Sequence, residues 1–196
     1  MELCNFGAKV VYPPTIYPVF HKNIPIIIKN TFNPSAPGTL IGDTRAAAKG
    51  HQALGVSSLA DTRLISVPDP ALYSRMINML TKNGIETMLA NGSDACGIKG
   101  AEAQKALGIL REEFANELMN AGSDIKLSDR LSTVALVGRG ATDAADLPAR
   151  MAKTLNAAGI PIYQAPQQVS DGSVACMVSA LDLNDALKTI HSTFLN

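Results

Sequence analysis

A strand–helix–strand pattern that occurs twice is the feature that most constrains what this chain can fold into. In its first occurrence, residues 64–67 predict a strand, and Leu72, Met76 and Leu80 then recur at the spacing of one helical face. Gly84 ends that helix, and residues 85–89 predict a second strand. Strands that alternate with helices indicate a layered α/β fold.

The second occurrence begins at residues 134–137, which again predict a strand. An amphipathic helix follows, Gly159 ends it, and residues 160–163 predict the next strand. The helix-ending glycines Gly84 and Gly159 are 75 positions apart, whereas the first strands are offset by 70, so the second loop is five residues longer. This repetition indicates an internal duplication.

Each copy continues with a third strand and a second helix, which gives the order β-α-β-β-α. This is a ferredoxin-like unit that lacks its last strand. The third strands lie near residues 95–98 and 173–178, and the second helices near 102–120 and 183–194.

The last strand of each unit has to come from elsewhere in the chain. Residues 125–127 can complete the first unit, but no residues follow the last helix to complete the second. A strand-like run at residues 56–59 precedes the first copy. We therefore predict that one of these two runs completes the second unit, in an α/β (α+β) fold of two interlocked units.

Charge and hydropathy exclude several partners. The 196 residues carry 17 Lys plus Arg and 17 Asp plus Glu, so the net charge of zero argues against nucleic acid or an anionic membrane surface as a partner. No apolar run is long enough to span a membrane. A net charge near zero favours self-association, so we expect a homo-oligomer, or a fragment cut from something larger.

Reactive side chains do not form a recognisable catalytic or metal-binding set. Cys4, Cys96 and Cys176 are far apart and odd in number, which is typical of a reducing cytoplasm rather than of a disulfide framework. The three histidines have no carboxylate or cysteine at ligand spacing. We therefore expect no metal and no catalytic residue, and predict a binding protein rather than a catalyst.

Residues 1–41 differ in texture from the duplicated part. Three prolines break any helix across residues 10–19, and the β-branched run 24–28 predicts a short buried strand. Prolines, asparagine and glycine in residues 33–38 predict a turn. Residues 42–54 are small and polar, as in a connector.

Two loops of the second copy are candidate ligand contacts. The turn Gly138-Arg139-Gly140 joins a strand to a helix but lacks the third glycine of a dinucleotide fingerprint. Backbone N–H groups at such a turn suit the carboxylate of a small ligand such as an amino acid. Ser170-Asp171 follows the second strand at the place that Ser93-Asp94 takes in the first copy; an ordinary turn is the competing interpretation.

Residues 6–13, Phe-Gly-Ala-Lys-Val-Val-Tyr-Pro, resemble the Phe-Gly-Ala-Lys-Val-Leu-His-Pro signature of aspartokinases. Residues 24–41 are similar to the segment that closes the kinase domain of that family, and the tandem repeat resembles its paired regulatory ACT domains, one inserted in the other. The long helix around residues 111–118 and the last six residues look most like the bifunctional aspartokinase/homoserine dehydrogenases.

The resemblance implies a division into four parts. Residues 1–41 would be a remnant of the amino-acid-kinase domain, 42–54 a linker, 55–130 the first ACT domain and 131–196 the second. The Lys-Phe-Gly-Gly phosphate motif of the kinase does not occur. The resemblance therefore implies phosphotransfer with ATP and Mg²⁺ for a parent kinase, and no cofactor and no enzyme activity for this chain.

The resemblance also implies roles for particular residues. Gln167, Ser170 and Asp171 fall on the glutamine, serine and glutamate of the family's Gln-Gly-Ser-Ser-Glu effector loop, and Asn91 takes the place of that glutamine in the first copy. Together with Gly138 and Gly140, these residues are the expected effector contacts. Lys9 would lie at the nucleotide-binding edge of the parent kinase.

The implied function is feedback control of the first step of lysine, threonine and methionine biosynthesis. Threonine is the leading effector, with lysine and methionine as alternatives. A second possibility is an assembly module that only dimerises the kinase, which the replacements at Asn91 and Asp146 favour. The Gln167-x-x-Ser170-Asp171 pattern favours the sensor.

Overall fold

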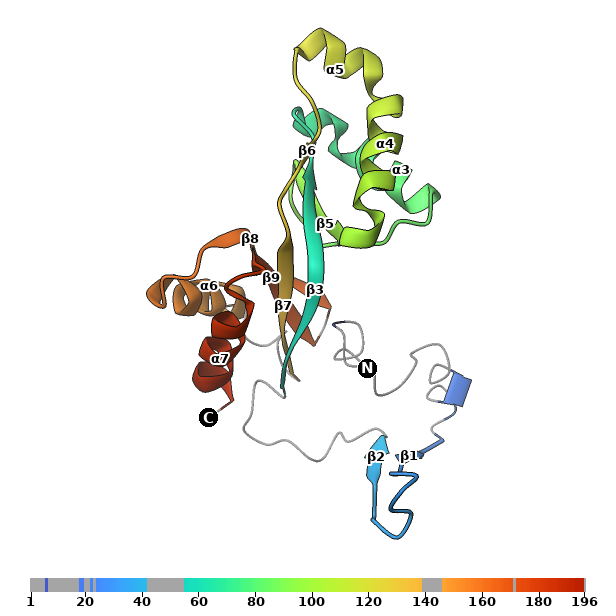
Figure 1. Cartoon of the computed structure of the whole chain (residues 1–196), viewed down its shortest axis with the longest axis vertical. Helices are drawn as coiled ribbons and strands as arrows, with labels where there is room; N and C mark the ends of the chain where they lie inside the picture. Colours follow the sequence, from blue (N-terminus) through green and yellow to red (C-terminus); the bar gives the residue numbers. More distant parts are fainter. Residues whose placement is uncertain are drawn as a thin grey trace.

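The computed structural model describes residues 6, 18–19, 22, 24–41, 55–138, 146–170 and 172–195. A hairpin of β1 (Ile26–Ile28) and β2 (Thr39–Ile41) stands apart from the other described elements in Figure 1. Ile27 and Leu40 are each 59% exposed, so the strand expected to be buried is largely open on one face. A two-stranded hairpin buries little apolar surface by itself. The predicted linker at 42–54 lies outside the described residues.

The rest of the described chain forms the two predicted ferredoxin-like units. In Figure 1 the helices of the first unit lie in the upper part of the molecule and those of the second at the lower left. The first unit contains β3 (Gly55–Ser66), η1 (Pro70–Leu72), α3 (Tyr73–Lys82), β4 (Thr87–Met88), β5 (Ala95–Lys99), η2 (Gly100–Glu102), α4 (Ala103–Glu113), α5 (Ala115–Ala121) and β6 (Lys126–Leu127). The second contains β7 (Leu131–Val137), α6 (Leu147–Ala157), β8 (Ile162–Ser170), β9 (Ser173–Ser179) and α7 (Leu183–Phe194).

Strand β3 belongs to both units, which confirms the predicted interlocking. Its first half, Gly55 to Leu59, pairs with β7, and its second half pairs with β5 and β6. The strand orders are therefore β6-β3-β5-β4 and β3-β7-β9-β8, the same order in each unit. The runs 56–59 and 64–67, predicted as separate strands, belong to the single strand β3, which ends at Ser66. This strand has an irregularity between Leu59 and Thr62, where Asp61 has a φ of 55°.

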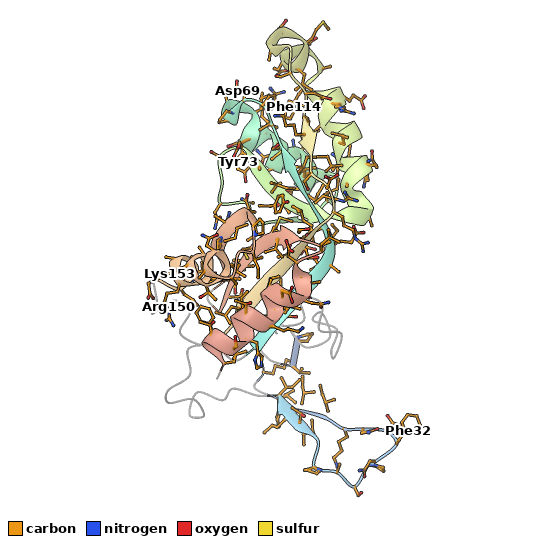
Figure 2. The ribbon with its side chains drawn as sticks, turned by 60° about the vertical axis from the view of Figure 1, so that its left-hand side comes forward. Phe32, Asp69, Tyr73, Phe114, Arg150 and Lys153 are labelled. Atoms are coloured by element: carbon orange, nitrogen blue, oxygen red, sulfur yellow. The ribbon has the colours of Figure 1, made fainter. Side chains whose placement is uncertain are left out.

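Two other elements differ from the sequence expectation. The helix expected at 102–120 bends at Phe114, whose backbone leaves the helical region while its ring is fully buried in the first unit (Figure 2). The strand expected to end at Tyr163 continues to Ser170, so Gln167 and Ser170 lie on a strand rather than on a loop. Pro166 is compatible with this position because β8 is an edge strand.

The helix ends of the two copies match, as the duplication predicts. Gly84 and Gly159 have φ values of 72° and 71°, which favour glycine after a helix. In each copy the following isoleucine donates its N–H back into the helix, from Ile85 to the Leu80 carbonyl at 2.9 Å and from Ile160 to the Leu155 carbonyl at 3.0 Å.

Consecutive residues of strands β7 and β9 are buried. Since side chains alternate between the two faces of a strand, both faces of β7 and β9 are covered. On β9, Val174 and Cys176 face the core under α6 and α7, whereas Ala175 and Met177 face the first unit. The second set belongs to a cluster that both units build, here called the junction core. It consists of Phe6, Leu89, Leu131, Ala135, Val137, Ala175 and Met177, with Leu64 packed against it.

Candidate functional site

The segment that follows β4 in the first unit lies against β8, the edge strand of the second. The Asn91 N–H donates to Gln167 Oε1 at 3.1 Å, and Asn91 Nδ2 donates to the Gln168 carbonyl at 3.2 Å. Earlier on β8, Gln164 Nε2 donates to the Leu89 carbonyl at 3.2 Å. Two amides predicted from matching places in the two copies are therefore brought together at one point.

A cavity of about 500 Å³ opens beside these amides. Its walls come from the segment between Glu86 and Asn91, from Lys99 on β5, from residues 168–170 on β8, and from Phe6 and Leu59. Asn91 and Ser170 thus line the cavity as predicted effector contacts, whereas Gln167 stands behind Asn91 and holds its backbone.

Opposite charges meet at the wall of this cavity. Lys99 Nζ donates to Glu86 Oε2 at 2.7 Å, and this hydrogen bond raises the pKa of the Lys99 ammonium, so it stays charged at neutral pH. Both side chains are well exposed, so the pair itself adds little stability. Neither residue could be identified from the sequence, because their pairing depends on which strands become neighbours.

A second tie fixes the segment that carries Asn91. The Tyr73 hydroxyl on α3 donates to the Ala90 carbonyl at 2.6 Å. Burial, with a smaller contribution from the nearby Cys96 and Asp94, raises the pKa of Tyr73 to about 12, so the hydroxyl remains a donor. The first unit therefore presents Asn91 from a segment held at Leu89, Ala90 and Asn91 itself.

Of the predicted turn at residues 138–140, the structure describes only Gly138. The Gly138 N–H already donates to the Gly172 carbonyl at 2.8 Å. Ser170 Oγ lies 2.7 Å from Ser173 Oγ and accepts from the Gly172 N–H, so this hydroxyl also serves the β8–β9 connection. Gly140, Asp171 and Lys9 lie outside the described residues.

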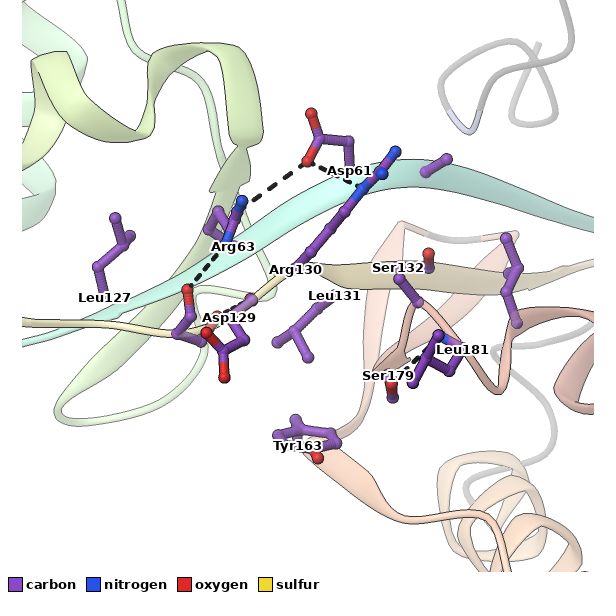
Figure 3. A pocket seen from close by; sticks show the side chains of 14 residues that line it. Asp61, Arg63, Leu127, Asp129, Arg130, Leu131, Ser132, Tyr163, Ser179 and Leu181 are labelled. Atoms are coloured by element: carbon purple, nitrogen blue, oxygen red, sulfur yellow. Dashed lines mark hydrogen bonds and ion pairs between the residues drawn. The ribbon is translucent and has the colours of Figure 1, made fainter.

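A larger cavity of about 1030 Å³ lies on another side of the junction (Figure 3). Three of its charged groups lie close together: Arg130 Nε is 3.4 Å and Arg63 Nε 4.0 Å from Asp61 Oδ1. Arg63 Nη1 also donates to the Ser128 carbonyl at 3.2 Å. None of the predicted site residues that the structure describes lines this cavity.

Nothing in the described ranges points to redox or metal chemistry. Burial raises the pKa of Cys96 and of Cys176 to about 12, which keeps both thiols protonated and unreactive. No group of three or more His, Cys, Asp or Glu side chains among these residues could hold a metal ion. None of the helices described is long and apolar enough to cross a membrane.

Comparison with known proteins adds family and fold. Residues 134–194 match the ACT domain family. The whole chain is 33% identical to a bifunctional aspartokinase/homoserine dehydrogenase of Haemophilus influenzae, of which it covers 25%. The chain thus spans about a quarter of the length of the curated relative.

Solved structures give the same fold. An aspartate kinase of Clostridium acetobutylicum matches 98% of this chain over 46% of its own length, with a TM-score of 0.76 and 24% identity. The regulatory subunit of aspartate kinase from Thermus thermophilus matches 74% of this chain over 99% of its own length, with a TM-score of 0.61 and 23% identity. Residues 134–194 thus match an ACT domain, and the chain as a whole is similar in sequence to a bifunctional aspartokinase/homoserine dehydrogenase and in fold to aspartate kinase structures.

Proposed function

We propose that the chain is the amino-acid-sensing region of an aspartate kinase and that the cavity beside Asn91 binds the effector. The observation that carries this proposal is the convergence of Asn91 from the first unit and Gln168 from the second on one cavity. A ligand held there contacts both units at once, so its binding is sensitive to their relative arrangement. A ligand that favours one arrangement shifts the population toward it.

The wall chemistry fits an α-amino acid. The Lys99 ammonium matches a ligand carboxylate, and the Glu86 carboxylate matches a ligand ammonium. Among the described residues nothing donates a hydrogen bond to Asn91 Oδ1, so this oxygen can accept from a side-chain hydroxyl. This favours threonine, the leading effector; a lysine ammonium satisfies the same acceptor, whereas a methionine thioether does not.

The output of the sensor is proposed to be control of a kinase domain in the parent protein. The N-terminal 41 residues resemble the end of such a domain, and the ATP and Mg²⁺ chemistry would reside in that domain. We expect no aspartyl phosphate from this chain with ATP and aspartate. We also expect a homodimer formed through the two ACT-like units.

The assembly-module alternative retains one supporting observation. Asn91, Gln167 and Gly138 already have partners within the chain, as a site without a ligand would. Under this alternative the cavity is a gap between two domains, and the chain serves only to dimerise the kinase.

Isothermal titration calorimetry of the chain with threonine, lysine and methionine separates the two functions. We expect one saturable event with threonine, weakened roughly 3- to 10-fold by Asn91→Ala, as loss of one hydrogen bond implies. Lys99→Ala should cost more, roughly 10- to 100-fold, because it removes a charged donor. Asn156 is an exposed residue of α6, so Asn156→Ala is the matched control and should bind like the wild type.

An absence of heat with all three amino acids, from a folded dimer, would favour the assembly module. Binding that Asn91→Ala and Lys99→Ala leave unchanged would move the effector site to another part of the chain.

A further inference from the structure

Phe6 is buried among residues that are distant from it in the sequence. Phe6 is only 8% exposed, and it packs in the junction core with Leu89, Val137 and Met177. It precedes strand β3 by 49 positions and belongs to the segment that resembles the kinase domain. A residue of the N-terminal segment is thus a structural component of the two-unit regulatory region.

The backbone of Phe6 is anchored as well as its ring. Ser57 Oγ donates to the Phe6 carbonyl at 2.7 Å. Ser57 lies on the half of β3 that completes the second unit, where it pairs with Ala135 of β7. The carbonyl is therefore held by the strand that both units share, while the ring packs in the junction core.

Phe6 also forms part of the wall of the proposed effector cavity. The cavity places it together with Asn91 of the first unit and with Gln168 of the second. A ligand that fills this space therefore packs close to Phe6. Removal of the ring would leave the cavity open on that side.

We propose that Phe6 is the positioning residue that couples occupancy of this cavity to the N-terminal, kinase-like segment. Binding of the amino acid stabilises the docked position of Phe6, and a docked Phe6 completes the binding site. Linkage makes the two effects equal: the factor by which docking tightens the ligand is the factor by which the ligand favours docking. The proposal rests on the proposed function, because it needs a ligand in the same cavity.

The test combines calorimetry with hydrogen exchange on the full chain, with threonine as the probe. Phe6→Ala should weaken threonine binding by about 10-fold or more, because the ligand loses an apolar wall. Phe6→Leu should retain most of the affinity. Phe32→Ala is the matched control, because Phe32 is 97% exposed at the tip of the β1–β2 hairpin (Figure 2), and it should change nothing.

Hydrogen exchange reads the reciprocal effect, which a merely structural role would not produce. Threonine should slow exchange in the peptide that contains Phe6 in the wild type, and should do so less in Ser57→Ala, which keeps the ring but removes its anchor. Thermal unfolding of each variant shows that it is folded.

The outcomes distinguish the two proposals. Threonine, lysine and methionine that all fail to bind the wild type would overturn the proposed function and the coupling with it. Binding to the wild type with the same affinity in Phe6→Ala, or with no change of exchange at the Phe6 peptide, would overturn the coupling alone.

Discussion

Individual residues at the site differ in how far the sequence could identify them. Asn91 and Gln167 could be found because the resemblance to aspartokinases places them on the effector loop of each copy, and the structure brings them into contact. Glu86, Lys99 and Phe6 could not be found, since each owes its place to packing between segments distant in the sequence. The sequence also could not show that the Gly138 N–H donates to the Gly172 carbonyl of the neighbouring hairpin.

Tyr73 should support the site through its hydrogen bond to Ala90. Tyr73→Phe removes the donor and leaves the carbonyl unpaired, so the free energy of unfolding should fall by about 1 kcal/mol. Threonine binding should weaken less than in Asn91→Ala, because Tyr73 acts only on the position of the segment. Urea unfolding and calorimetry measure the two effects. Tyr163→Phe is the control, with its ring 52% exposed, and an equal loss there would contradict this role.

Alkaline pH should destabilise the fold through its buried thiols. Burial raises the pKa of Cys96 and Cys176 from 9.0 to about 12, so the folded state holds these protons more tightly than the unfolded state. Their contribution is fully present below pH 9 and is lost as the pH rises toward 12. Urea midpoints at about pH 8 and about pH 10.5 should therefore differ in the wild type and differ less in a Cys96→Ala, Cys176→Ala variant. Equal pH dependence in both proteins would refute this cause.

At the scale of elements, strand β3 and strand β8 show where one-dimensional reasoning succeeds and where it stops. A missing last strand in each copy predicts the sharing of strands, which β3 confirms. Periodicity cannot show that two strand-like runs are joined through Asp61, because a bulge interrupts the alternation. It also ends β8 too early, because Pro166 and the two glutamines have low strand preference, and pairing with β9 overrides that preference.

Close contact with Met88 of the first unit and Met177 of the second should make Gly97 sensitive to substitution. A Cβ there would lie 2.7 Å from Met88 Cγ and 3.1 Å from Met177 Cε, so Gly97→Ala should destabilise the chain by about 1 to 3 kcal/mol. Gly108 on α4 is the matched control, since its Cβ would meet nothing within 4 Å. Gly108→Ala should stabilise by about 0.5 to 1 kcal/mol, because alanine favours a helix. If chemical denaturation shows that Gly97→Ala leaves the free energy of unfolding unchanged, the close contact of Gly97 with Met88 and Met177 is contradicted.

The two ferredoxin-like units form one interlocked body rather than two independent domains. The second unit takes its last strand from residues that precede the first, and the junction core draws on both units. The duplication makes this topology predictable. The burial of β7 and β9 on both faces could not be predicted, because a ferredoxin-like sheet by itself needs helices on only one face.

Cutting the chain between the units should therefore fail to release a stable second unit. A fragment that begins near residue 130 would lose Gly55 to Leu59, which pair with β7. Limited trypsin digestion at Arg130 should leave pieces that stay associated on gel filtration and unfold together. Release of a folded fragment covering residues 131–196 would contradict the interlocked topology.

The central claim is that one amino acid binds between the two units, and mapping its contacts by NMR tests this most directly. Titration of threonine into the isotope-labelled chain should shift the backbone resonances of Asn91, Lys99 and Gln168 together, at one saturable concentration. The resonances of Asp61, Arg63 and Arg130 at the larger cavity should stay in place. Shifts confined to that larger cavity, or to one unit only, would contradict the account.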